Sequence, residues 1–542
     1  MPNNNLDCVV VGYNDVDFTE FATVQHSISH RSGAYHEIKT NSVLLDDRRY
    51  TYMELMNRAI ASATGSDPRL NVFEAPLLGA FYLAHFLYRK GYSAEVVNFF
   101  TYDKDKLRML LERSPRAVAI TTTFYIDHAP IIEIVEFVRQ HSPRTKIVVG
   151  GPHIYNLSSD LDEETQDYVF QQIGADIYII DSQGESTLAS LMCELRKGQN
   201  GDLQQVSNLC YAAAGSFRRT LRLPESNDLD EATIDWSVFD PRDVAPITYL
   251  RTARSCPFVC TFCNYPTLAG AHVVTTVDNI ESQLRYLHEI GTTHVVFIDD
   301  TFNVPLPRFR ELLRMMIRNQ FGFRWISFFR CSNADEEVIE LMKESGCVGV
   351  LLGIESGDQR ILRFMKKAAT LERYEWGIHQ LHRREIATFV SLICGFPGET
   401  EESVKNTLAF VERTAPTFFN VQLYYHDLRA PIHAQAEEFG IEGAGYSWKH
   451  KTMDWREAAR WSVHMFQNVQ NSIPLTLYGF SLWGISYLLS KGLTLDQIKA
   501  FGNIARPLLL RSLDDVSSSY SEYEHSLADL FRGMSALKLA PG

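Results

Sequence analysis

The sequence predicts an α/β protein made of a doubly wound parallel-sheet domain, a partial (β/α)6 barrel and a mostly helical C-terminal region. Three observations predict this fold class. Short apolar runs alternate with helical patterns in two series, an irregular polar stretch separates the series, and the last part of the chain is aromatic with helical spacing. Alternating strands and helices are typical of parallel sheets. The expected divisions are 1–70, 71–212, 213–246, 247–429 and 430–542.

The doubly wound domain is predicted over residues 71–212. Helical spacing over residues 80–90 ends at Gly91, where a C-terminal cap belongs. Strands are expected at 94–99, 117–121, 146–149 and 175–180, and helices at 130–140 and 185–196. The segment 1–70 before it opens with an apolar run at 8–12 that reads as a buried strand, and the rest of that segment has no assigned role.

The second series begins after the linker predicted at 213–246. Its expected strands are 249–254, 295–298, 325–330, 349–353, 388–393 and 420–425. Six strand-helix units are fewer than the eight of a closed barrel, so a partial barrel is predicted, with its site at the carboxyl ends of the strands.

Composition limits the function classes. The formal net charge of -14, from 52 basic and 66 acidic residues, argues against a broad nucleic-acid surface. The N-terminus has no basic start, and no segment has the length of apolar sequence that spans a membrane, so a cytoplasmic protein is expected. Nine cysteines are scattered along the chain and three of them cluster. This pattern favours a metal site over a disulfide framework.

The three clustered cysteines are Cys256, Cys260 and Cys263, directly after the first barrel strand. Thiolates at this spacing in one loop can converge on one iron-sulfur cluster. Such clusters usually take four cysteines, so three leave one iron for another ligand. A zinc loop or simply buried cysteines are the alternatives, and the lack of a nearby fourth Cys or His counts against zinc.

The Cys-x3-Cys-x2-Cys spacing after the first strand of a partial barrel resembles the radical S-adenosylmethionine (SAM) superfamily. The resemblance implies a [4Fe-4S] cluster on these cysteines, an open iron that chelates SAM, and a 5'-deoxyadenosyl radical formed on reduction. It also implies that residues at the strand ends contact SAM. For each of these motifs the alternative is a turn that only shapes the backbone. The residues concerned are Phe262, Asp299, Asp300, Arg330, Ser332, Gly353, Glu355 and Gly395.

The doubly wound domain resembles the cobalamin-binding domain of class B radical SAM methyltransferases. Such a sheet binds ligands beyond its strand ends, and glycine turns let backbone N–H groups approach a nucleotide tail. A flavodoxin-like domain with no ligand or with another nucleotide is the alternative. The residues expected to contact cobalamin are Pro76, Thr121, Thr122, Thr123, Phe124, Tyr125, Gly150, Gly151, Pro152, Gly184 and Glu185.

One departure bears on the cobalt ligand. Cobalamin domains that bind the metal through histidine use Asp-x-His-x-x-Gly, whereas here Asp127 and His128 are adjacent and no glycine follows. His128 is therefore not expected to bind cobalt. The resemblance implies base-off cobalamin with Phe124 or Tyr125 facing its lower side.

The two resemblances together imply methylcobalamin-dependent methylation of an unactivated centre. Hydrogen abstraction, methyl transfer and remethylation of cobalt by a second SAM would give deoxyadenosine and S-adenosylhomocysteine. An external electron donor, such as flavodoxin or ferredoxin, and a small-molecule or peptide substrate are the expected partners, with no nucleic acid and no membrane. The rival hypotheses are a radical oxidoreductase or cyclase without methyl transfer, and a sensing protein that retains the fold.

More narrowly, residues 7–15, 32–35 and 446–454 resemble the branch of phosphinothricin-type P-methyltransferases. In that branch the methyl acceptor is an H-phosphinate phosphorus, and related enzymes act on carbon in natural products. Tyr446, Trp448 and His450 are accordingly candidate substrate residues, with simple packing as the alternative.

Overall fold

The computed structural model describes residues 6–231, 233–478 and 480–532. The chain forms two compact units. The first comprises Met1–Val16 and Phe73–Val244, and the second comprises Asp17–Val72 and Ala245–Gly542. The chain therefore leaves the first unit after its first strand and returns to it before the rest of that unit is built.

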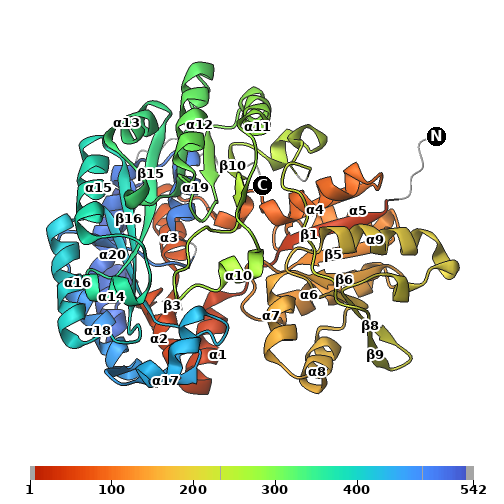
Figure 1. Ribbon diagram of the computed structural model, residues 1–542, viewed down its shortest axis with the longest axis horizontal. Helices are drawn as coiled ribbons and strands as arrows, with labels where there is room; N and C mark the ends of the chain where they lie inside the picture. The colour runs from red at the N-terminus through yellow and green to blue at the C-terminus, as the bar shows by residue number, and fades with distance from the viewer. Residues whose placement is uncertain (1–5, 232, 479, 533–542) are drawn as a thin grey trace. The chain divides into compact units, whose positions relative to one another are not determined.

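The first unit is a seven-stranded sheet with helices on both faces (Figure 1). Its strands, in the order β4-β1-β5-β6-β7-β8-β9, are β1 (Cys8–Tyr13), β4 (Ala94–Phe99), β5 (Ala117–Thr121), β6 (Lys146–Gly150), β7 (Ile177–Ile179), β8 (Leu209–Ala213) and β9 (Ser216–Arg219). Its helices are α4 (Leu78–Arg89), α5 (Lys104–Glu112), α6 (Ala129–His141), α7 (Pro152–Asp160), α8 (Glu163–Ile173) and α9 (Glu185–Arg196). The strands from β4 to β7 are parallel, and β8 and β9 are antiparallel.

Burial explains why β1 lies inside this sheet. Cys8, Val9, Val10 and Val11 are all fully buried, as expected for a strand covered on both faces. Val9 and Val11 belong to the same apolar cluster as residues of α5, α6 and α8, while the alternate side chains face away from it. The chain connections reverse direction between β1 and β5, and such a switch point is where doubly wound sheets bind ligands.

A buried carboxylate, Asp7, fixes the start of β1. It accepts hydrogen bonds from the backbone N–H of Ser93 at 2.9 Å and from Arg196 at 2.6 Å. It also pairs with Arg116. Burial by itself would raise the pKa of Asp7, but the hydrogen bonds from Arg196 and Ser93 outweigh it and lower the pKa from 3.8 to about 2. Asp7 thus ties β1 to the beginning of β4 and the end of α9.

The second unit is built on a seven-stranded parallel sheet. In order across the sheet the strands are β10 (Ile247–Leu250), β13 (His294–Phe297), β14 (Arg324–Phe328), β15 (Cys347–Glu355), β16 (Ala387–Cys394), β17 (Phe418–Leu423) and β21 (Ile473–Pro474). The helices between them are α10 (Tyr265–Ala269), α11 (Val277–Glu289), α12 (Leu306–Asn319), α13 (Glu336–Glu344), α14 (Gln359–Phe364), α15 (Leu371–Arg383) and α16 (Glu401–Thr414). The predicted six strands are present, and β21 is a seventh.

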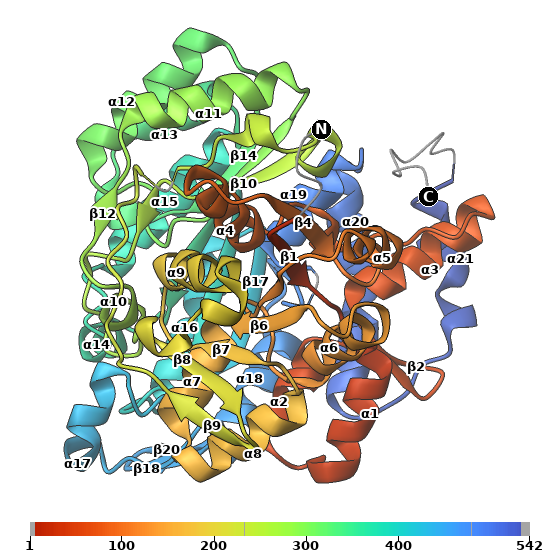
Figure 2. The same cartoon turned by 90° about the vertical axis from the view of Figure 1, so that its right-hand side faces the viewer.

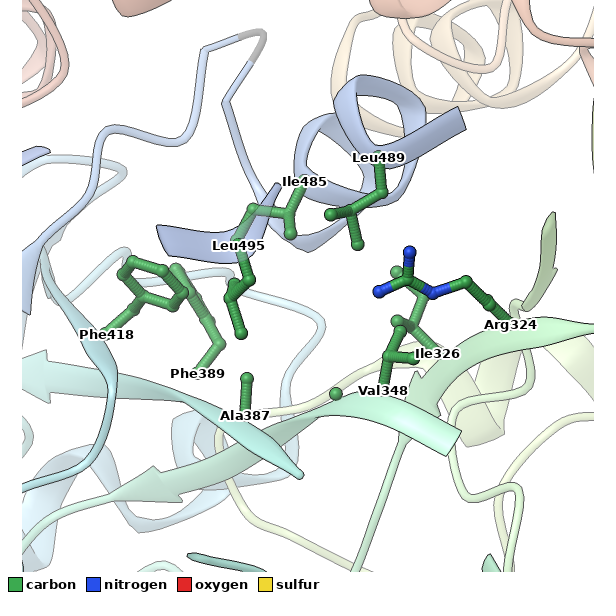
Figure 3. Close-up of a pocket in the computed structure, with 10 residues that line it drawn as sticks. Arg324, Ile326, Val348, Ala387, Phe389, Phe418, Ile485, Leu489 and Leu495 are labelled. Atoms are coloured by element: carbon green, nitrogen blue, oxygen red, sulfur yellow. The ribbon is translucent and has the colours of Figure 1, made fainter. Parts of the chain in front are cut away.

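The amino ends of these strands are closed by packing (Figure 3). A cavity of about 20 Å³ lies there, lined by Arg324, Ala387 and Phe418 at the starts of β14, β16 and β17. Ile485 and Leu489 of α19 (Leu482–Ser490) and Leu495 of α20 (Leu495–Leu513) cover it. Its volume is about that of one water-sized probe. This end of the barrel therefore serves stability, and chemistry is left to the opposite end.

Most of the segment 17–72 was predicted to lie in a separate N-terminal division, 1–70. In the structure this segment belongs to the second unit. It folds into α1 (Phe18–Ser29), α2 (Gly33–Thr40), β2 (Val43–Leu45), β3 (Arg48–Tyr50) and α3 (Tyr52–Thr64). Its elements pack on α18 (Trp455–Asn468), on α20 and on α21 (Glu524–Asp529), as Figure 1 and Figure 2 show for α2 and α18. Residues 1–70 are therefore divided between the two units.

The C-terminal region is mainly helical, as predicted, with one small sheet in addition. That sheet consists of β18 (Glu442–Ala444), β19 (Ser447–His450) and β20 (Met453–Asp454) and follows the short helix α17 (Ala436–Phe439). The predicted linker also contains structure, because β8 and β9 extend the sheet of the first unit to Arg219. Within the described residues, none of the helices combines the length and the apolar character that a membrane crossing requires.

Replacing Asp7 with Asn is expected to lower the free energy of unfolding by about 1–3 kcal/mol at pH 7, because buried donors lose a charged acceptor. A carboxyl with a lowered pKa stabilises the fold above its ordinary pKa and loses that contribution as the pH falls toward the folded-state value. The difference between wild type and variant should therefore shrink between pH 4 and about 2 in urea denaturation. Asp105→Asn, at an 86% exposed side chain, is the control, and an equal loss in both variants would contradict the assignment.

Candidate functional site

The cysteine loop leaves the sheet of the second unit at the carboxyl end of β10. The Oδ1 atom of Asp299, which follows β13, holds its beginning by accepting hydrogen bonds from the N–H groups of Thr252 and Ala253, at 2.6 and 2.9 Å. The Thr252 hydroxyl donates to the same carboxylate. Asp299 is 2% exposed, so it positions the loop, and its oxygens are already occupied. Asp300, the next residue, remains exposed.

The far side of the loop is held by Thr261, between the second and third cysteines. Its N–H donates to the carbonyl of Met365 at 2.9 Å and its hydroxyl to that of Phe364 at 2.9 Å. Its own carbonyl accepts from the N–H of Ile432. The loop is thereby fixed to the segment after α14 and to the segment after β17.

The three thiols differ in exposure. Cys260 is buried at 8%, whereas Cys256 and Cys263 are half-buried. Burial raises the pKa of Cys256, and it raises that of Cys263 to about 11. Cys256 and Cys263 thus favour the neutral thiol by themselves, and binding a metal centre would replace their protons. Among the described residues, no group of three or more His, Cys, Asp or Glu side chains has the geometry of a site for one metal ion.

Arg330 lies directly over the cysteine loop from the end of β14. Its guanidinium carbon is 3.5 Å from the centre of the Phe258 ring, which stands between Cys256 and Cys260. The backbone of Arg330 is fixed by Asn303, which exchanges hydrogen bonds with it at 3.0 and 2.9 Å. Its Nε is buried and makes no hydrogen bond within the described part of the chain. An unused buried donor beside the loop is the group that a bound carboxylate would satisfy.

A buried ion pair lies at the end of β15. The carboxylate of Glu355 pairs with Lys367 at 2.8 Å, and the Lys367 ammonium is 5.2 Å from the centre of the Phe262 ring. Glu355 has φ of 67°, a strained value for a residue other than glycine. A Cβ at Gly353 would be 2.5 Å from the Glu355 carboxylate, so glycine leaves room for the pair. Ser332 is half-buried in the turn after β14.

The turn after β16 is built on Gly395, with φ of 95°. A Cβ there would be 2.4 Å from the Trp448 ring, so only glycine allows this approach. Trp448 is 2% exposed and donates to the carbonyl of Tyr424, and His450 stacks on it and lies 3.2 Å from the Gly395 carbonyl oxygen. The Glu399 carboxylate accepts from the Gly395 N–H. Trp448 and His450 therefore support this turn by packing, whereas Tyr446 is half-buried and its ring lies edge-on to that of Tyr425.

In the first unit, the predicted threonine run follows β5 at the switch point. Thr121 donates to the carbonyl of Gly12 at 2.7 Å and Thr122 to that of Gly150 at 2.9 Å, so these hydroxyls tie neighbouring strands together. Gly151 has φ of 109°, and a Cβ there would lie 2.9 Å from the Thr122 hydroxyl. Thr123 is exposed at the same edge. Gly151 and Pro152 begin α7 at the next strand end.

The turn at Gly184 is already occupied by a carboxylate of the chain. Glu225 accepts hydrogen bonds from the N–H groups of Ser186 and Thr187, at 2.9 and 2.7 Å, and so caps the N-terminus of α9. The Glu185 carboxylate is 6% exposed and accepts from Asn227. The N–H groups of Ser186 and Thr187, directly after the Gly184-Glu185 turn, therefore donate to Glu225 in the predicted linker and are not open to a nucleotide.

An aromatic surface lies at the carboxyl ends of β1 and β5. Tyr13 contacts Phe73, Tyr125 and Phe124, with ring centres 3.9, 5.0 and 6.3 Å apart. Tyr125 is buried and its hydroxyl accepts from the Asn14 N–H at 2.6 Å, while Phe124 is 49% exposed. Pro76 is buried in the segment that leads into α4. An exposed apolar ring at the switch point fits the flat face of a large planar cofactor.

Three residues that contribute to the site could not be identified from the sequence. Phe258 and Lys367 act through contacts with Arg330, Glu355 and Phe262 that only the fold brings about. Glu225 lies in a stretch that looks like a linker. Glu399, by contrast, follows the glycine turn Gly395-Phe-Pro-Gly directly, and its spacing from Gly395 could have identified it as the acceptor that closes the turn.

The residues present fit the expected cofactors in both units. The second unit offers three thiols in one fixed loop, and beside them an Arg330 Nε that has no hydrogen-bond partner among the described residues. The first unit offers an exposed aromatic surface at the switch point of its sheet. The predicted residues of each set thus gather at the carboxyl edge of one sheet, with Asp299, Trp448 and His450 in supporting positions.

Comparisons with known proteins agree with this division. The Radical SAM superfamily model matches residues 250–411, and the B12 binding domain model matches residues 72–178. An uncharacterized methyltransferase, PH0819 of Pyrococcus horikoshii, is 27% identical over 353 residues, covering 62% of this chain and 73% of that protein. The anaerobic magnesium-protoporphyrin IX monomethyl ester cyclase of Rubrivivax gelatinosus is 24% identical over 390 residues, covering 67% of each.

Solved structures share the fold over most of the chain. The radical SAM methyltransferase TsrM from Kitasatospora setae, with cobalamin and a [4Fe-4S] cluster bound, superposes with a TM-score of 0.57 at 16% identity, covering 84% of this chain and 96% of that one. The cobalamin-dependent SAM radical enzyme OxsB, with aqua-cobalamin bound, gives 0.58 at 14% identity, covering 97% and 84%. With the two domain matches, the chain is a B12-binding radical SAM enzyme, whose cofactors are a [4Fe-4S] cluster, SAM and cobalamin.

Proposed function

We propose that this enzyme is a methyltransferase that methylates an unactivated carbon or a phosphinate phosphorus of a natural-product precursor. The observation that carries the proposal is the three-thiol loop at the carboxyl edge of the barrel, in a chain that also holds a B12 binding domain. When bound, the cluster with SAM supplies a hydrogen-abstracting radical and cobalamin supplies a methyl group. The names of PH0819 and TsrM as methyltransferases support the proposal.

The residues of the second unit have defined parts in this proposal. Cys256, Cys260 and Cys263 hold the cluster, and Asp299 keeps their loop in place from outside. Arg330 binds the carboxylate of SAM through its unpaired Nε, and Phe262 packs on the adenine. The ion pair with Glu355 holds the Lys367 ammonium beside the Phe262 ring. These assignments leave one iron free of protein ligands, as SAM binding requires.

In the first unit, the aromatic surface of Tyr13, Phe73 and Phe124 would contact cobalamin. Tyr125 is buried with its hydroxyl bonded to the Asn14 N–H, so Phe124 is the ring of this pair that is open to a cofactor. His128 is the N-cap residue of α6, and we propose no metal role for it. An external electron donor, such as flavodoxin or ferredoxin, would reduce the cluster.

The narrower proposal concerns the acceptor. The sequence resemblance to phosphinothricin-type P-methyltransferases favours an H-phosphinate phosphorus. A cyclase or oxidoreductase without methyl transfer is the second candidate. It is favoured by the similarity to the magnesium-protoporphyrin IX monomethyl ester cyclase, which covers 67% of this chain, against 62% for PH0819.

Replacing Cys256, Cys260 and Cys263 together with Ala is expected to remove iron from the anaerobically reconstituted protein and to reduce 5'-deoxyadenosine to the level of a sample without enzyme. Iron content and chromatography of the products measure both effects. Cys193→Ala, at an exposed cysteine outside the loop, is the matched control and should retain both. Undiminished deoxyadenosine in the triple variant would refute the assignment, and none in the wild type would favour a sensing protein.

Replacing Arg330 with Gln is expected to raise the KM for SAM by about 10- to 100-fold, since a hydrogen bond to a charged group is worth about 1.5–3 kcal/mol. The iron content should not change, because Arg330 is not a cluster ligand. Deoxyadenosine formation at varied SAM concentration measures the KM. An unchanged KM, or loss of iron in parallel, would show that Arg330 serves the loop and not SAM.

Product analysis separates the two candidate reactions. A methyltransferase that also uses the radical forms S-adenosylhomocysteine and 5'-deoxyadenosine in similar amounts, whereas a cyclase forms deoxyadenosine alone. The measurement uses reduced holoenzyme with H-phosphinates and peptides, followed by mass spectrometry. Deoxyadenosine without S-adenosylhomocysteine, together with a product of unchanged carbon count, would decide for the cyclase.

A further inference from the structure

The segment 17–72 brings a buried acid, Glu37, to the carboxyl edge of the barrel sheet. Glu37 lies on α2, which packs against β17, α18 and α20. Its Oε1 accepts a hydrogen bond from the N–H of Leu423 at 2.8 Å. Leu423 is the last residue of β17, and the strands of this sheet are parallel. Glu37 therefore lies at the same edge of the sheet from which the cysteine loop departs.

Close packing at Gly33 fixes the position of α2. A Cβ at Gly33 would be 2.5 Å from the carbonyl oxygen of Tyr446, so α2 rests directly on the backbone there. Gly33 and Glu37 are four residues apart and share a helix face. On the neighbouring face, His36 Nε2 is 2.7 Å from the Ser462 hydroxyl of α18. Two independent contacts thus hold the helix that presents Glu37.

The charge of Glu37 has no partner of opposite sign in the part of the chain that the structure describes. Within the described residues, its carboxylate makes the one hydrogen bond from Leu423 and no ion pair, although Glu37 is only 8% exposed. Burial raises the pKa of Glu37 to about 7, and the Leu423 N–H offsets this only in part. Tyr446 and Tyr478 lie close by, and burial together with the Glu37 carboxylate raises the pKa of Tyr478 to about 12.

A buried carboxylate without a cation is costly, and packing alone gives no reason for an acid at this position. A glutamine would accept the Leu423 hydrogen bond equally well. A ligand that carries an ammonium group would provide the missing charge, and the rings of Tyr446 and Tyr478 are suitable neighbours for a cation. Perturbed acids of this kind are typical of functional sites.

We propose that Glu37 is a specificity-determining residue that binds an ammonium group of the substrate at the barrel mouth, beside Tyr446. The inference rests on the proposed function, since it treats this edge of the sheet as the place where the methyl acceptor binds. It assigns to the segment 17–72 the recognition of a part of the substrate remote from the reacting atom. The substrate class that follows is an amine-bearing acceptor.

The test uses two H-phosphinates that differ only in an amino group, with the full-length reconstituted holoenzyme at pH 8. Calorimetric titration measures the affinity for each probe without turnover. The wild type should prefer the amino probe, and Glu37→Gln should weaken its binding by about 10- to 100-fold and leave the other probe unaffected. Glu37→Asp, which keeps the charge, should restore part of the preference.

His36→Gln is the matched control on the same helix. It disturbs the contact with Ser462 and is expected to lower the melting temperature while the preference for the amino probe persists. If His36→Gln removes the preference as Glu37→Gln does, Glu37 acts only through the docking of α2. Equal or absent binding of both probes to the wild type, or an undiminished preference in Glu37→Gln, would also overturn the proposal.

Product analysis of the same samples keeps this inference apart from the proposed function. If neither probe gives S-adenosylhomocysteine but the amino preference depends on Glu37, methyl transfer to these acceptors is refuted and the Glu37 site stands. If both probes are methylated equally well by wild type and Glu37→Gln, methyl transfer stands and the Glu37 site is refuted.

Discussion

The parallel arrangement of the strands is the constraint on which the other features depend. In each unit the strands of the parallel sheet point the same way, so segments far apart in the sequence end at one edge. In the second unit this brings together the cysteine loop, Arg330, Glu355 and Gly395, which follow four different strands. In the first unit it brings Tyr13 and Tyr125 into contact from β1 and β5. The amino ends of the barrel strands are closed by α19 and α20, so one edge of the sheet remains for chemistry.

Much of the site depends on side chains that hold the backbone and not on side chains that face a ligand. Asp299 uses both oxygens on the start of the cysteine loop, and Glu225 uses both on the start of α9. Trp448 occupies the space that a side chain at position 395 would need. Fixed backbones of this kind reduce the loss of freedom when a cofactor is bound, because the loops are ordered in advance. This supporting role also explains why a polar side chain at a strand end, such as Asp299, is more deeply buried than a side chain that contacts a ligand would be.

The sequence allowed the parallel strands β1, β4, β5, β6 and β7 and the first six strands of the barrel sheet to be predicted, because buried parallel strands are short apolar runs. Strands β8, β9 and β21 were missed. The antiparallel pair β8–β9 runs into the polar stretch predicted as a linker, and the two residues of β21 give no apolar run. The role of residues 17–72 was missed because connectivity does not show which sheet a segment joins. Trp448 and His450 were proposed for the substrate, but a motif gives no direction to a side chain, and both turn toward Gly395. The roles of Lys367 and Glu37 depend on contacts between distant parts of the chain, and no local sequence pattern indicates them.

The segment 17–72 shows how such an enzyme can change its substrate without altering its cofactor sites. It is an insertion between β1 and α4, and the entropy cost of closing a loop grows only slowly with its length, so a long insertion there is tolerated. The cysteine loop, Arg330 and Gly395 all belong to the barrel itself and are independent of this insertion. Glu37 meets the barrel at the end of β17, away from the first strand where the cysteine loop begins. Substitutions on α2 can therefore alter which group of a substrate is recognised, while the cluster ligands and their supporting hydrogen bonds are left in place.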